Sequence, residues 1–109
     1  MDSDREQRMA ANEGLARRIN EAIESGQWPG EQGQRTAYRC ECAQLDCKRT
    51  VELMPAEYEQ VRAHPRRFLV LPGHERPQVE TVIEATPAYL VVSKDGDAGG
   101  VAEATDPRD

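Results

Sequence analysis

The sequence has few aromatic residues and no long hydrophobic run. Only 5% of its 109 residues are Phe, Trp or Tyr, so there is little material for a large apolar core. No stretch approaches the roughly 18 consecutive apolar residues that a membrane-spanning helix needs. The first twenty residues mix both charge signs and lack the apolar segment of a secretory signal. These absences predict a small, soluble protein of the cytoplasm.

Cysteine is also scarce, and its number is odd. A chain with three cysteines and no export signal is expected to keep its thiols reduced rather than build a disulfide framework. All three fall within eight residues, in the order Cys40, Cys42 and Cys47. The alternative interpretation is that they are small buried hydrophobic side chains. Their close spacing favours a metal site instead.

Charge and composition divide the chain into four expected segments. Residues 1–34 carry four basic and seven acidic side chains (-3), residues 35–74 carry seven and five (+2), and residues 75–109 carry three and eight (-5). The expected segments are an N-terminal helix over residues 1–26, a linker over 27–34, a zinc-binding α+β domain over 35–94, and a disordered acidic tail over 95–109. The tail is expected to be disordered because it has almost nothing to bury.

The N-terminal segment has the periodicity of an amphipathic helix that ends near Gly26. Arg17 and Glu24 fall outside its apolar stripe. Two interpretations of that stripe stay open: it packs on the protein's own domain, or it docks on a partner protein or a second copy. Trp28 in the linker is a further candidate anchor for a partner. The stripe contains Ala11, Leu15, Ile19, Ala22 and Ile23.

The middle of the chain predicts short strands around one short helix. Residues 36–42 and 48–53 are expected to pair as a hairpin with Cys47 in its turn. A helix should begin at Pro55 and end before Pro65, because proline suits a first helical turn. Three further strands are expected over 67–71, 79–85 and 89–94. The predicted fold class is α+β, with an N-terminal amphipathic helix followed by a small zinc-stabilised antiparallel β domain with one short helix.

The spacing Cys-x-Cys-x4-Cys can bring three thiolates onto one zinc ion, which prefers four tetrahedral ligands. The fourth ligand should then be a histidine, His64 or His74. His74 is preferred because it follows Pro72-Gly73, a turn that can aim a side chain inward. His64 stands at a helix end beside Pro65. Asp46 is a weaker substitute.

A structural zinc fits this short chain better than a catalytic one. A unit of about 60 residues buries only about 60% of its unfolded surface, so a bound metal would decide whether it folds. The sequence lacks the His-Glu-x-x-His motif and the deaminase signature, and the protein is therefore predicted not to be an enzyme. A redox or metal sensor that releases zinc on thiol oxidation is the alternative function.

A family resemblance covers about Tyr38 to Lys94 and extends to the N-terminal Ala-Asn-Glu helix. It rests on CECAQLDCKRTVELMPAEYEQVRAHPRRFLVLPGHE, followed by VETVIEATPAYLVVSK. This pattern resembles a family of small uncharacterised bacterial proteins with a zinc knuckle, a Glu-Tyr helix and a Pro-Gly-His turn, and it brings no activity with it. The knuckle alone is also similar to the post-SET zinc motif of lysine methyltransferases, which implies only zinc geometry.

Several basic residues lie in the central unit, among them Arg62, Arg66 and Arg67. They could form a nucleic-acid-binding patch, but interleaved glutamates and a net charge of -6 favour an ordinary solvated face. The preferred function is a zinc-binding protein-interaction or regulatory module. Its partner is expected to be another protein, bound through Leu15, Ile19 and Ile23 or through Trp28.

Overall fold

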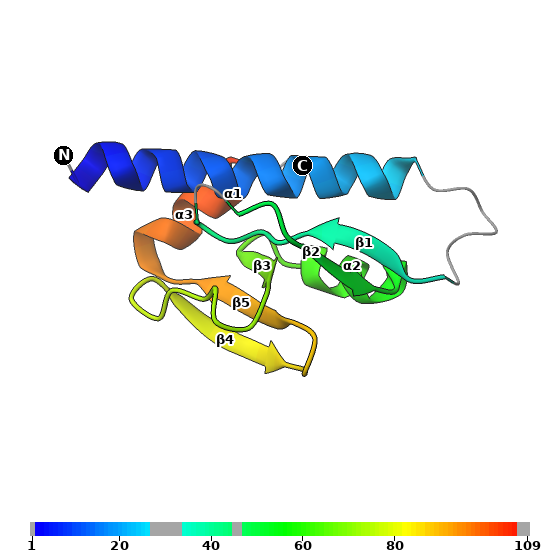
Figure 1. Cartoon of the computed structure of the whole chain (residues 1–109). Coiled ribbons are helices and arrows are strands. Elements are labelled where there is room, and N and C mark those ends of the chain that lie inside the picture. Colours follow the sequence, from blue (N-terminus) through cyan, green and yellow to red (C-terminus); the bar gives the residue numbers. More distant parts are fainter. Residues whose placement is uncertain (1, 27–33, 45–46, 107–109) are drawn as a thin grey trace.

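A computed structural model of the chain describes residues 2–26, 34–44 and 47–106, and it contains two small sheets and three helices (Figure 1). The long helix α1 runs across one side of the molecule, and both sheets lie on the same side of it. In chain order the elements are α1 (Asp2–Ser25), β1 (Thr36–Arg39), β2 (Thr50–Leu53), α2 (Pro55–Arg62), β3 (Arg67–Val70), β4 (Glu80–Ala85), β5 (Leu90–Lys94) and α3 (Gly96–Ala104).

Both sheets are antiparallel, and the predicted α+β class is confirmed. Strands β1 and β2 form the expected hairpin, with Tyr38 opposite Val51. The second sheet has the order β3-β5-β4, so the last strand lies between the other two. Its edge strand β4 is interrupted by a bulge between Val82 and Glu84.

Strand β1 ends at Arg39, earlier than the sequence predicts, and this early end positions the cysteines. The backbone N–H of Cys40 still donates to Arg49 O at 2.9 Å, but that of Glu41 donates to Leu69 O at 2.6 Å. The chain therefore passes from the hairpin to strand β3 within residues 40–44, which are called the cysteine segment below. The segment links the two sheets.

The core lies between the two sheets and helix α2. The rings of Tyr38 and Tyr58 stack with centroids 4.4 Å apart and an interplanar angle of 13°. Buried side chains of β3 and β5 pack beside them, including Leu69 and Val92. The three cysteines belong to the same buried cluster. A metal site here would therefore be part of the core.

The apolar stripe of α1 is divided between the two interpretations left open by the sequence, because Ile23 packs against the core whereas its N-terminal part faces outward. Leu15 is 46% exposed and Ala11 is exposed, whereas Arg17 and Asn20 are completely buried. The Arg17 guanidinium explains the difference, because it lies 4.4 Å from the Phe68 ring centroid and donates to two backbone carbonyls. One of these carbonyls is in the last turn of α3, where helical hydrogen bonds are missing. Polar contacts, rather than the apolar stripe, set the orientation of α1.

Two buried ion-pair clusters also attach α1 to the rest of the fold. The Lys94 ammonium pairs with Glu13 of α1 and with Glu80 of β4. The Arg62 guanidinium at the end of α2 pairs with Glu21 of α1 at 2.7 Å, and also with Asp106. Arg62 is therefore not part of an exposed basic patch.

The expectation of a disordered tail from residue 95 is wrong for the described part of that segment. Helix α3 follows β5 directly, and its Ala102 is buried in the core cluster. Gly99 of this helix packs closely against Lys94 and Arg66. An added Cβ would lie 2.8 Å from Lys94 O and 2.4 Å from an Arg66 nitrogen. The small residues of this segment offer little surface to bury, which predicts disorder, but the same small residues allow this close contact. The β domain therefore carries two short helices, not one.

None of the described helices is long and apolar enough to cross a membrane. The predicted linker at 27–34, including Trp28, falls outside the described residues except at its last position. The division of the chain into separate segments stays a prediction.

Candidate metal centre

A tight turn after strand β3 presents His74. Its backbone N–H donates to Leu71 O at 3.0 Å, which closes a four-residue turn with Pro72 and Gly73 in the middle. Gly73 has a φ of 91°, a conformation that favours glycine, and proline suits the position before it. The sequence Leu-Pro-Gly-His therefore codes for this turn locally, as predicted.

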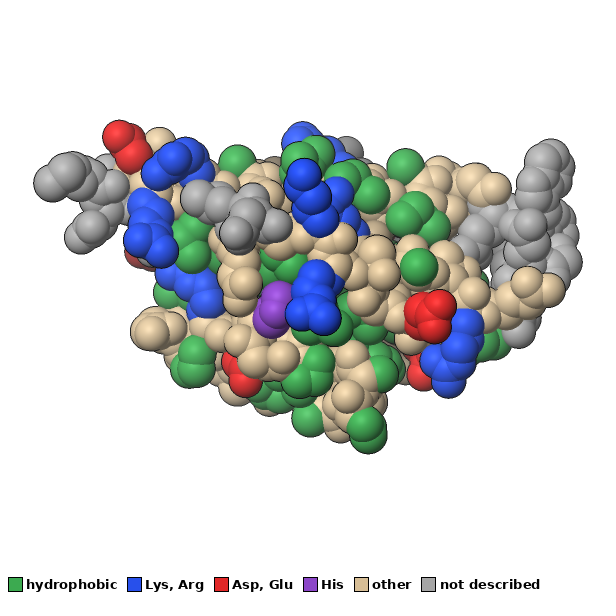
Figure 2. Space-filling view, viewed as in Figure 1, with side chains coloured by type: hydrophobic (Ala, Val, Ile, Leu, Met, Phe, Trp, Pro, Cys, Tyr) green, Lys and Arg blue, Asp and Glu red, His purple; other side chains and the backbone are tan. Residues whose placement is uncertain are grey.

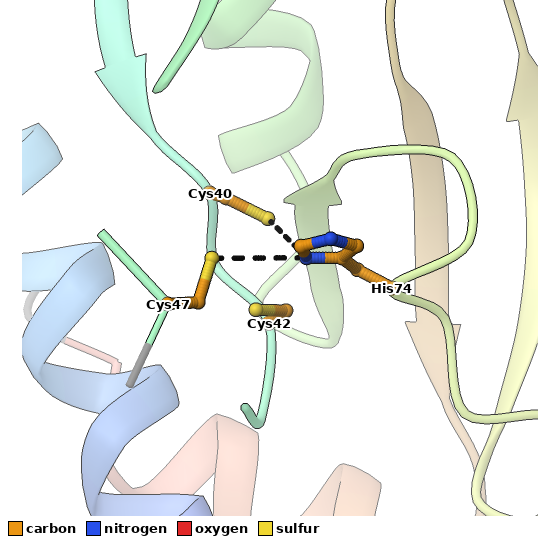
Figure 3. Close-up of side chains that lie close together, drawn as sticks. All are labelled: Cys40, Cys42, Cys47 and His74. Carbon is orange, nitrogen blue, oxygen red and sulfur yellow. Dashed lines mark hydrogen bonds between the residues drawn. The ribbon is translucent and has the colours of Figure 1, made fainter. Parts of the chain in front are cut away.

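The turn brings His74 to the three cysteines, whose side chains point toward it and toward one another (Figure 3). One donor atom from each of the four residues lies within 4.8 Å of all the others. His74 Nδ1 is 3.6 Å from Cys40 Sγ and 3.7 Å from Cys47 Sγ. The cysteines are between 1% and 8% exposed, and the histidine is half-buried. The sequence-predicted ligand set is thus a real spatial cluster.

Two donor separations in the cluster match those of a tetrahedral zinc site. With bonds of about 2.3 Å to sulfur and about 2.0–2.1 Å to nitrogen, a tetrahedron places the sulfur and nitrogen ligands about 3.6 Å apart. The two distances to His74 Nδ1 match that separation. The residues present therefore fit a zinc ion.

The three thiols strongly affect one another's ionisation. A hydrogen bond with the Cys40 thiol lowers the pKa of Cys42 to about 5, against the opposing effect of burial. The same hydrogen bond, together with burial, raises the pKa of Cys40, and burial raises that of Cys47. Several thiolates this close repel one another, and a bound dication relieves that repulsion. The Leu71 N–H also donates to Cys40 Sγ at 3.2 Å.

The other candidate ligands are not in this cluster. His64 is exposed at the end of α2, and its side chain is not among the clustered donors. Asp46 lies outside the described residues. His74 rather than His64 is therefore the histidine that meets the cysteines.

Glu41 lies between two of the cysteines in the sequence, but its carboxylate is not among the clustered donors. Its carboxylate is completely buried and accepts hydrogen bonds from the Tyr58 hydroxyl at 2.6 Å, the Asn20 amide at 2.8 Å and the Leu69 N–H at 2.9 Å. Burial raises the pKa of Glu41, and these three donors oppose that effect. Both carboxylate oxygens are thereby engaged in joining α1, α2 and β3.

Substitution Glu41→Gln is expected to destabilise the fold by about 1–3 kcal/mol, because the amide nitrogen of glutamine would face a donor and leave it unsatisfied. Chemical denaturation of the metal-loaded protein measures this loss. The control Glu52→Gln makes the same change at an exposed position of β2 and should leave stability unchanged. Equal stability of the two variants would contradict the role given to Glu41.

The basic side chains do not form one continuous surface on the face of the described residues that Figure 2 shows. On the face in Figure 2, Lys and Arg side chains stand in several separate groups among neutral and hydrophobic ones. Arg66 pairs with Glu103 at 3.2 Å, and Arg62 is buried. This arrangement lacks the continuous basic surface typical of nucleic-acid binding.

Sequence reasoning missed the polar residues that attach α1 near the metal centre. Asn12 donates to the backbone carbonyl of Cys42, and Asn20 donates to that of Arg39, just before the first cysteine. A signal was present, because Glu13, Arg17, Asn20 and Glu24 recur at helical spacing and mark a second possible face. Apolar periodicity alone favours the other face.

Comparison with known proteins adds no relative: no family model, curated protein or solved structure matches the chain.

Proposed function

We propose that this chain is a zinc-binding protein in which one structural zinc ion is held by Cys40, Cys42, Cys47 and His74. The convergence of these four donors within 4.8 Å carries the proposal. Thiolate and imidazole are ligands that suit zinc. When bound, the ion would supply cross-links between the hairpin segment and the turn after β3.

A structural role is favoured over a catalytic one by the number of donors and by their surroundings. Four protein ligands complete a tetrahedron, whereas catalytic zinc sites keep one position for water or substrate. The nearest carboxylate in the sequence, Glu41, is buried outside the donor cluster and accepts three hydrogen bonds. It is not placed to act as a general base on a metal-bound water.

Metal content and affinity test the site directly. Reduced, purified protein should bind one zinc per chain, and Co²⁺ in its place should give the absorption of a tetrahedral thiolate site. His74→Ala should lower the zinc affinity by more than about 100-fold, since loss of even an outer-shell partner costs about 10–100-fold.

His64→Ala is the matched control, because that histidine is exposed and lies outside the donor cluster. It should bind zinc as the wild type does. Equal affinities of the two histidine variants, or a wild-type protein without zinc, would overturn the proposed site.

We further propose that the zinc-stabilised fold serves as a protein-interaction module. Leu15 and Val101 are 46% and 48% exposed, although both are large and apolar. Close by, Ala11 and Val101 line an open groove of about 740 Å³ between α1 and α3. Ile23, another expected contact, instead packs against the protein's own core. The partner surface proposed is therefore the exposed side of α1 together with this groove.

Charged substitutions on that surface test the interaction role. Leu15→Glu and Val101→Glu should abolish co-purification of a partner from cells of the source organism while leaving the thermal midpoint nearly unchanged. Val82→Glu is the control, because Val82 is 42% exposed on β4, outside the groove. If all three variants captured the same proteins as the wild type, this surface would not be the interface.

A further inference from the structure

Helix α1 contacts the cysteine segment through the side chain of Asn12. Its amide nitrogen donates to Cys42 O at 3.3 Å and to Gln44 O at 3.1 Å. One carbonyl belongs to the second cysteine and the other lies two residues beyond it, where the chain has left the β1–β2 ladder. Asn12 thus fixes the backbone that carries the Cys42 ligand.

Two turns further along α1, Asn20 holds the other end of the segment. Its carbonyl oxygen accepts from the Arg39 N–H at 2.7 Å, and its amide nitrogen donates to Arg39 O at 2.9 Å. The same amide nitrogen also donates to the Glu41 carboxylate at 2.8 Å. Asn20 is completely buried, so these bonds are shielded from water.

The two asparagines bracket two of the metal ligands. Cys40 and Cys42 lie between their anchor points at Arg39 and Gln44, outside any regular strand. Only part of this segment is tied to the sheets, through the N–H groups of Cys40 and Glu41. The helix therefore supplies bonds to the carbonyls that the strands leave without ladder partners.

We propose that Asn12 and Asn20 are positioning residues of the metal centre, and that metal binding and docking of α1 are coupled through them. The inference rests on the proposed zinc site. Outer-shell groups that orient ligands commonly affect metal affinity by about 10–100-fold. Because coupling between two equilibria is reciprocal, bound zinc must favour docked α1 by the same factor by which docked α1 favours zinc.

The test measures zinc affinity and α1 protection in the full-length protein. Asn12→Asp keeps the shape of the side chain but removes its donor. Asn20→Ala removes the side-chain hydrogen bonds of the second asparagine. Each should lower zinc affinity about 10- to 100-fold. In the zinc-saturated variants, amides of α1 should exchange hydrogen faster, while amides of β3 and β5 keep their protection. The Co²⁺ spectrum should stay that of the wild type, because the four ligands are unchanged.

A core variant separates positioning from general destabilisation. Val91→Ala leaves a cavity beside β5 and should lower the thermal midpoint. Because zinc binding is coupled to folding, its zinc affinity should fall only by the factor that this loss of stability accounts for, and the exchange of α1 relative to the core should not change. If both asparagine variants bound zinc within twofold of the wild type, the coupling would be overturned while the zinc site stood. If the wild type bound no zinc, both proposals would fail.

Discussion

Removal of zinc with a chelator under reducing conditions should unfold the part of the chain that contains the two sheets. The reason is that small domains are only marginally stable from apolar burial, and here the candidate ligands lie inside the core. The three cysteines occupy the same buried cluster as Tyr38, Leu69 and Val92. Structural zinc contributes on the order of 10–16 kcal/mol of apparent binding free energy, which exceeds the stability of most small domains. Near-UV circular dichroism should collapse on chelation and return when zinc is added back.

A ligand variant should reproduce the effect of the chelator. Cys42→Ser replaces one thiolate, so the variant should not fold and should show no cooperative unfolding transition even with zinc present. Ala43→Ser is the matched control, because it adds the same hydroxyl to the neighbouring buried position without removing a ligand. It should cost about 1–3 kcal/mol, because it buries an added hydroxyl, and it should still fold cooperatively and keep the metal. Metal-free protein with a full near-UV spectrum would show that the core is sufficient without zinc.

The cluster of candidate metal ligands could be predicted from the sequence because its parts are coded locally. Three ligands fall within eight residues, and the fourth follows a Pro-Gly pair whose turn geometry depends on those two residues. Strands β3 and β5 also form where short apolar runs place them. Only the contact of His74 with the cysteines depends on tertiary structure. The chain has just two histidines, so few alternatives for the fourth ligand existed.

The orientation of α1 could not be predicted, because it depends on partners far away in the chain. Arg17 is buried only because Phe68 offers a ring and Ala102 offers an unpaired helix carbonyl. Hydrophobic periodicity records only which positions are apolar, so it cannot detect such contacts. The apolar stripe is real as a pattern, but its Ala11 and Leu15 face outward and its Ile23 packs against the core.

Helix α3 was missed for the same reason. Its sequence is rich in glycine and alanine and offers little apolar surface of its own. The helix is held by contacts from outside it, namely the Arg17 guanidinium on Ala102 O and the close packing of Gly99 against Lys94 O. Composition alone therefore favours disorder in a segment that long-range contacts order.

Arg62 connects α1, α2 and the end of α3, and its loss should have the second-largest effect on stability. Its guanidinium is completely buried and pairs with Glu21 at 2.7 Å and with Asp106, whose side chain is 7% exposed. Removing one member of a buried ion pair leaves a desolvated charge behind, at a cost of about 3–5 kcal/mol.

Arg62→Ala should therefore lower the urea midpoint of the zinc-loaded protein strongly, and added salt should change this loss little, since buried pairs are poorly screened. Arg66→Ala is the matched control: Arg66 pairs with Glu103 where the two side chains are 40% and 48% exposed. Such surface pairs contribute about 0–1 kcal/mol.

Replacing Asp106 by asparagine in the Arg62→Ala background should recover part of the loss, because the stranded charge is removed. Equal losses in Arg62→Ala and Arg66→Ala would mean that the chain does not bury Arg62 beneath α1.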